Sequence, residues 1–153
     1  MRSAALLLFL LGACGAPAGT PAEEVVKNLD AYRGRPVDVR AKLKSGARCR
    51  QGEDGEWKTY CKDCVYCRGP LVVDLGTDTS STSNELDWPL ILGGTYEYED
   101  IRCKGLLNEV KCTPMEDGKT YVIRGIIEFQ RPPKLLVEKF WEVDDPSRGK
   151  FAH

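Results

Sequence analysis

Four cysteines in the first half of the chain have a spacing that supports thiol chemistry. Cys61, Cys64 and Cys67 form two overlapping Cys-x-x-Cys pairs, and Cys49 lies shortly before them. Such a set has three interpretations: structural disulfides, a four-thiolate zinc site, or a redox-active pair. Zinc sites of this kind usually have two separate Cys-x-x-Cys pairs, whereas these overlap. A redox pair needs a thiolate at a helix start, but the breaker Gly69-Pro70 and a predicted strand follow the motif.

Disulfides are the interpretation we adopt for six cysteines, provided that the chain is exported. A bridge between Cys103 and Cys112 would close a ten-residue loop and stabilise the fold by roughly 2–3 kcal/mol in the chain-entropy model. Cys49 is the natural partner for the cluster. The pairing stays open, because six cysteines allow about 15 connectivities. The six are Cys49, Cys61, Cys64, Cys67, Cys103 and Cys112.

The N-terminus predicts export. Met1-Arg2-Ser3 carries one positive charge and precedes an apolar run over residues 4–11. That run is too short to cross a bilayer, which needs roughly 20 apolar residues, and is typical of a signal peptide.

The run ends in Leu11-Gly12-Ala13-Cys14, which resembles the lipobox of bacterial lipoproteins. The resemblance implies that a signal peptide, residues 1–13, is cut off, that Cys14 carries acyl chains such as palmitate, and that residues 14–19 form a tether to the membrane. Gly15 replaces the Asp that usually retains such proteins in the inner membrane, so the resemblance implies the outer membrane of the cell envelope. The alternative is an ordinary secretory signal with an incidental cysteine.

Composition argues against several classes of activity. His153, on the tail, is the only histidine, so Ser-His and Cys-His catalysis and histidine metal sites are excluded. The net charge of −1 gives no general attraction to nucleic acid. We expect no enzyme activity, no cofactor and no metal site. The acidic residues are interpreted as solvated faces: Glu97, Glu99, Asp100, Asp144 and Asp145.

Aromatic and basic residues interleave around the cysteine cluster, at Trp57, Tyr60, Tyr66 and Arg68. That mixture is typical of a nucleic-acid platform, but the charge and the envelope location argue against one. Trp, Tyr and Arg are also enriched at protein contacts. We therefore predict a disulfide-braced surface that contacts another envelope protein or a ligand.

The elements that must position these residues are mainly strands. Strict alternation predicts strands at residues 37–44 and 121–129, the second with Ile123, Ile127 and Phe129 on one inward face. A short strand is predicted at 71–75 and a last one at 135–143, with Leu135, Val137, Trp141 and Val143 on one face. Thr20-Pro21 is typical of a helix start, and Gly34 of its end.

The strands at 37–44 and 121–129, the latter interrupted by Gly125, are similar to those of small OB-fold barrels in envelope proteins. We therefore expect one mainly β domain over residues 20–146. It is an OB-like five-stranded barrel with a short N-terminal helix and a disulfide-braced insertion, followed by a flexible tail at 147–153. A β-sandwich is the competing architecture.

The predicted function is that of a lipid-anchored envelope protein with a binding or structural role. The alternative is a thiol-based zinc or redox protein that uses Cys61, Cys64 and Cys67.

Overall fold

The computed structural model describes residues 17–52, 54–58, 63–76, 87–94, 101–143 and 149–150. Within them the elements, in chain order, are β1 (Thr20–Pro21), α1 (Ala22–Lys27), the 3-10 helix η1 (Leu29–Tyr32), β2 (Pro36–Ser45), β3 (Arg48–Arg50), β4 (Tyr66–Asp74), β5 (Ile91–Gly94), β6 (Arg102–Gly105), β7 (Lys111–Thr113), β8 (Thr120–Glu128), β9 (Lys134–Glu142) and β10 (Gly149–Lys150).

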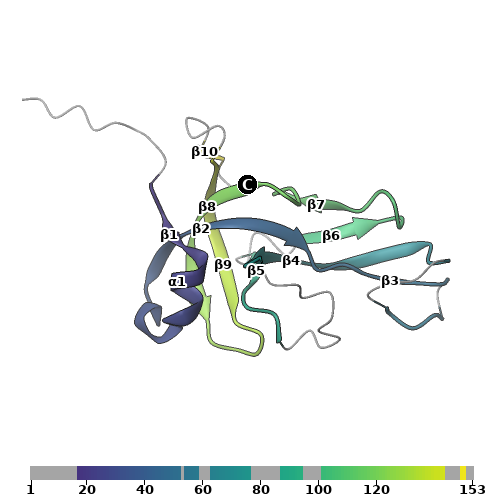
Figure 1. Cartoon of the computed structure of the whole chain (residues 1–153), viewed down its shortest axis with the longest axis horizontal. Helices are drawn as coiled ribbons and strands as arrows, with labels where there is room; N and C mark the ends of the chain where they lie inside the picture. The colour runs from purple at the N-terminus through teal and green to yellow at the C-terminus, as the bar shows by residue number, and fades with distance from the viewer. Residues whose placement is uncertain are drawn as a thin grey trace, which may run out of the picture.

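Five strands close into a barrel (Figure 1). β2 pairs with β8, β8 with β9, β9 with β5, β5 with β4, and β4 returns to β2. Every pair is antiparallel except β5 with β9, which run parallel. Closure removes the exposed edges that an open sheet would leave. The predicted fold class, an OB-like five-stranded barrel with a short N-terminal helix, is confirmed, and the β-sandwich alternative is wrong.

Alternating side chains of β2 and β8 fill the barrel, as the sequence pattern predicts. Successive residues of a strand point to opposite faces, so one face of β2 is apolar and the other charged. Ile123 and Ile127 of β8 are both buried in the same core. The buried residues of β2 are Val37, Val39, Ala41 and Leu43.

β9 departs from the predicted alternation because it contains a β-bulge. Its register with β8 shifts between Arg124 and Gly125, and Glu138 is skipped. A skipped residue reverses which face the following side chains occupy. Phe140 therefore packs in the barrel core, and Trp141, which was predicted to share the inward face of the strand, does not belong to that core.

Two other predictions about single residues are wrong. Phe129 follows the end of β8, is 38% exposed and lies 4.2 Å from the guanidinium of Arg33 instead of entering the core. Thr20, expected to cap the helix, pairs with Val39 in the short parallel strand β1. α1 begins after Pro21 without a side-chain cap and spans six residues.

A second sheet projects from the barrel. β4 continues beyond it at its N-terminal end, where Tyr66–Pro70 pairs with β3 on one side and with β6 on the other, and β6 pairs with β7. We call these four segments the cystine sheet: residues 48–50, 66–70, 102–105 and 111–113. It lies at the end of the molecule opposite β1 and α1 (Figure 1).

The described residues near the two ends of the chain can be compared with the predicted signal peptide and tail. Residues 1–16, with the predicted signal peptide and Cys14, lie outside the described residues. Gly149 and Lys150, within the predicted flexible tail, pair with Trp141 and Phe140 of β9. No helix in the described part of the chain is both long and apolar enough to cross a membrane.

The burial of β8 leads to a stability prediction. Ile123→Ala removes a fully buried side chain, and we expect it to lower the free energy of unfolding by roughly 2–5 kcal/mol in denaturant titrations. Ile126→Ala on the outer face of the same strand is the matched control and should cost clearly less. Equal losses at both positions would contradict the assignment of the inward face.

Candidate functional site

Two disulfides cross the cystine sheet between residues that lie directly opposite each other. Cys49 bonds to Cys67 and Cys103 to Cys112, with Cα–Cα distances of 4.0 and 3.9 Å. Cys64 is also disulfide-bonded, and Cys61 lies outside the described residues. The predicted local bridge between Cys103 and Cys112 is confirmed, and Cys49 does pair within the cluster.

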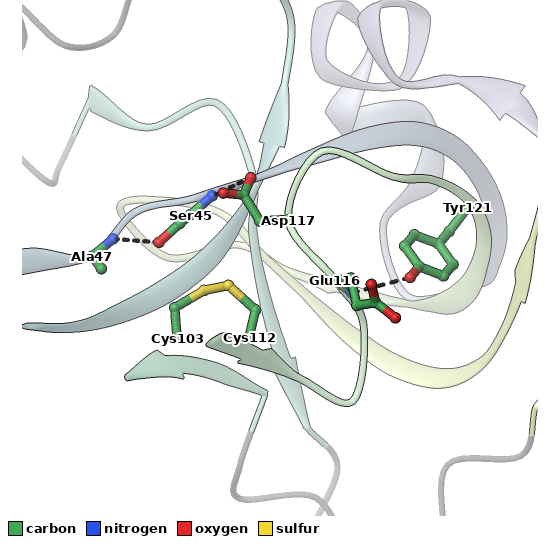
Figure 2. The surroundings of a disulfide bond; sticks show 7 residues. All are labelled: Ser45, Ala47, Cys103, Cys112, Glu116, Asp117 and Tyr121. Carbon is green, nitrogen blue, oxygen red and sulfur yellow. Dashed lines mark hydrogen bonds between the residues drawn. A yellow bond between two sulfur atoms is a disulfide. The ribbon is translucent and has the colours of Figure 1, made fainter. Parts of the chain in front are cut away.

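The Cys103–Cys112 disulfide joins the sheet to the barrel. Both sulfur-bearing residues belong to the main core cluster, together with Met115. Figure 2 shows this disulfide beside the end of β2, where the carboxylate of Asp117 accepts a hydrogen bond from the backbone N–H of Ser45 at 3.1 Å. The chain that follows β7 is therefore fixed against β2.

A buried tyrosine completes this junction. The hydroxyl of Tyr121 accepts a hydrogen bond from the backbone N–H of Glu116 at 3.0 Å (Figure 2). Burial raises the pKa of Tyr121 above its ordinary value, which keeps the hydroxyl protonated to a higher pH. Its ring packs edge-on against Phe140, 5.8 Å between centroids. The connection from β7 to β8 is thus anchored in the barrel core.

The other disulfide makes a second, smaller core. Cys49, Cys64 and Cys67 are buried together, with Ala47 and Val110 packed against them. No larger apolar side chain takes part among the described residues of this cluster. We infer that crosslinks, rather than apolar area, hold the outer part of the sheet.

Basic residues occupy the face of the cystine sheet opposite the cysteines. Because side chains alternate along a strand, the neighbours of each bridged cysteine point away from the disulfides. The four segments of the sheet contain six basic and no acidic residues. We call this surface the basic face: Arg48, Arg50, Arg68, Arg102, Lys104 and Lys111.

Four of these residues form one row across the sheet. Arg48 lies opposite Arg68, Arg68 opposite Lys104, and Lys104 opposite Lys111. The last three are exposed. Like charges directly opposite each other on a sheet are destabilising, so the row is unfavourable to folding by itself.

Ion pairs link charged residues on the outside of the barrel. There, cations face acids on neighbouring strands: Arg124 pairs with Asp38 at 2.7 Å, and Lys119 with Glu142 at 3.0 Å. Hydrogen bonding to Glu142 raises the pKa of Lys119. By composition, the four segments of the cystine sheet carry an excess of positive charge in a chain whose net charge is only −1.

Trp57 lies on the basic face between two guanidinium groups. The central carbon of Arg50 is 4.7 Å from the indole centroid, and that of Arg68 is 4.5 Å. The ring of Tyr66, 41% exposed, is tilted against the indole with 6.1 Å between centroids. Stacked guanidinium and aromatic groups hold one another in place, so this cluster is preorganised.

A groove of about 860 Å³ separates the basic face from β5. A side chain at Gly93 would collide with that of Lys134, so the glycine lets this lysine lie beside the groove. Arginine and lysine thus line both sides. The lining residues are Arg48, Trp57, Arg68, Gly69, Pro70, the β5 residues Ile91–Gly94, Ile101, Arg102 and Lys134.

The structure brings three of the four predicted binding residues together. Trp57, Tyr66 and Arg68 are in one cluster, and Tyr60 lies outside the described residues. Sequence reasoning missed Arg48, Arg50, Arg102, Lys104, Lys111 and Lys134. A usable signal exists, because each of the four paired cysteines has a basic residue next to it, in Arg48-Cys49-Arg50, Cys67-Arg68, Arg102-Cys103-Lys104 and Lys111-Cys112.

Other candidate chemistry finds little support in the described residues. No cluster of His, Cys, Asp or Glu suited to a metal ion occurs among them. The acidic residues considered in the sequence, at 97, 99, 100, 144 and 145, lie outside this part of the chain. Comparison with protein-family models, with curated proteins and with solved structures finds no match.

The two disulfides should have different effects when removed. Replacing either pair by serine should cost about 3 kcal/mol in the chain-entropy model. In the Cys49→Ser/Cys67→Ser protein, we expect hydrogen exchange to show lost protection in β3 and the first half of β4 while β8 stays protected. In the Cys103→Ser/Cys112→Ser protein, whose disulfide lies in the barrel core, protection in β8 should fall as well. The same exchange pattern in both would refute the division into two cores.

Proposed function

We propose that this protein is a lipid-anchored binding protein of the bacterial cell envelope, and that it holds an anionic partner on its basic face. The observation that carries the proposal is the groove beside Trp57, with arginine on one side and Lys134 on the other. Positive charge gathered in a concave site raises the local concentration of an anionic partner and its rate of association.

The side chains of the groove favour binding over catalysis. Among the described lining residues there is no carboxylate, histidine, serine or cysteine to act as a general base or nucleophile. Preorganised Trp, Tyr and Arg side chains lose little entropy on binding and are enriched at contact hot spots. The Trp57 cluster has this composition.

The anchor rests on the resemblance of Leu11-Gly12-Ala13-Cys14 to a lipobox. Acyl chains on Cys14 would tether the domain to the outer membrane through residues 14–19. The described chain begins near β1, at the end opposite the cystine sheet (Figure 1). A domain tethered there presents its basic face away from its own membrane.

The thiol-based alternative has no observation in its favour. Cys67 bonds to Cys49 and not to Cys64 of the same Cys-x-x-Cys motif. Zinc is bound by cysteine thiolates, and the sulfur atoms of Cys49 and Cys67 are joined in a disulfide instead.

The anchor has a direct test. Cys14→Ser should leave the protein uncleaved or release it from membranes, as measured by fractionation and by incorporation of labelled fatty acid. Labelled fatty acid on the Cys14→Ser protein would refute the lipobox interpretation. Wild-type protein in the inner-membrane fraction would refute the outer-membrane location.

The binding face has a separate test in intact cells. A photoreactive residue at Tyr66 should give crosslinks to a partner, and the same residue at the exposed Glu24 of α1 should not. Arg68→Glu should remove the crosslinks from Tyr66, because it reverses a charge within the cluster. Equal crosslinking from both positions, or none from Tyr66, would contradict a binding role for this face.

A further inference from the structure

We propose that the occupant of the basic face is an extended acidic segment of a partner protein, with acidic side chains at alternate positions. This inference rests on the proposed function and specifies the chemistry of the partner. Its basis is the spacing of the cationic row, the concave shape of the groove and the place of the face in the molecule.

The spacing of the row matches an extended chain. Arg48, Arg68, Lys104 and Lys111 occupy four neighbouring strands. Strands lie about 4.8 Å apart, so the row spans roughly 14 Å. In an extended segment, side chains on one face recur every two residues, or about 6.7 Å, so three alternate carboxylates span about 13 Å. A segment that crosses the strands can therefore place three carboxylates along four cations.

The shape of the site argues against a flat anionic surface. Arg48, Arg68, Arg102 and Lys134 all line the groove, so a ligand that enters it lies among cationic residues. A bilayer surface is too broad to enter a groove of about 860 Å³. A single extended chain is narrow enough, because an unpaired strand needs only about the 4.8 Å that separates neighbours in a sheet.

Aromatic groups at one end of the row favour a polypeptide over a uniform polyanion. Trp57 and Tyr66 lie beside Arg68, and Ile91 lines the same groove. In a segment of alternating pattern, the residues between the carboxylates provide side chains for such apolar contacts. A polymer of phosphates has no equivalent groups and would use only the cations.

The two ends of the cationic row differ in their side chains. Trp57 stacks beside Arg68 at the β3–β4 end of the row, and Lys104 and Lys111 are exposed beyond it. Replacing Lys104 and Lys111 by acidic residues reverses the charge at these positions and leaves the residues of the aromatic cluster and of the groove lining unchanged. These two positions therefore test the acidic character of the occupant without altering the rest of the site.

Binding of a synthetic peptide to the purified full-length protein tests the inference. The probe is a labelled nine-residue peptide with Glu and Val at alternate positions, measured by fluorescence anisotropy at low salt. Its control has the same composition with all Glu residues at one end. We expect the alternating peptide to bind at least about tenfold more tightly than its control, and binding to weaken as salt rises.

Charge-reversal variants then locate the site. Lys104→Glu/Lys111→Glu should weaken binding of the alternating peptide by at least about tenfold. Lys27→Glu/Lys42→Glu makes the same change in net charge at exposed positions of α1 and β2 and should bind like wild type. Thermal unfolding of both variants shows whether each is folded.

Several outcomes would overturn the inference. Equal binding of the two peptides, or equal loss in both variants, would show that only total charge matters. Linear polyphosphate that binds more tightly than the peptide, or vesicles with anionic lipid that bind through Lys104 and Lys111, would identify another occupant. If no peptide binds but a photoreactive residue at position 66 still crosslinks to a partner in cells, the occupant is not an acidic segment and the proposed function stands. If the Tyr66 crosslinks are absent as well, both fail.

Discussion

The geometry of the candidate site depends on one strand that belongs to two sheets. From Leu71 onward, β4 pairs with β2 in the barrel, and at Val72 it meets β5; from Pro70 backward, its neighbours are β3 and β6. An edge of a strand can pair with only one neighbour at each residue, so β5 and β6 must separate there. The groove lies where they separate. Gly69 lies at this change of partners, because any side chain on it would collide with the backbone of Gly46 and Ala47, which connect β2 to β3 beside β4.

The disulfides and the basic face are consequences of the same alternation. A strand residue that faces inward has neighbours that face outward. Because the bridged cysteines share one face of the sheet, the residues next to them lie on the other face. In this sheet those neighbours are Arg and Lys, whose mutual repulsion opposes folding. The crosslinks supply the stability that the small core of Cys49, Cys64 and Cys67 lacks. We interpret this combination as a charged binding surface held rigid by covalent bonds.

Much of the barrel follows from the sequence, because its long strands alternate. The pattern of β2 identifies its buried face residue by residue, and the same holds for Ile123 and Ile127 of β8. Alternation fails in β9, where a bulge at Glu138 exchanges the roles of Phe140 and Trp141, since nothing local in the sequence marks the skipped residue. The candidate site was only partly predictable. Trp57, Tyr66 and Arg68 are close in sequence, whereas Lys104 and Lys111 reach the same face through long-range pairing of β6 with β4, which a local pattern does not encode.

The positions of the two ends of the molecule relate the proposed anchor to the proposed site. The described chain begins near β1, on the side of the barrel where α1 packs, and the cystine sheet projects from the opposite end (Figure 1). Residues 14–19 reach at most about 20 Å when fully extended. With the proposed lipid on Cys14, a tether that short would hold the N-terminal end of the barrel near the lipid surface and direct the cystine sheet away from the anchoring membrane. The same orientation would keep the cationic row away from the anionic head groups of that membrane, which would otherwise compete for it. Lipid attachment at one end and a rigid cationic groove at the other are therefore compatible in one small domain, and their separation by the barrel allows both to be occupied at once.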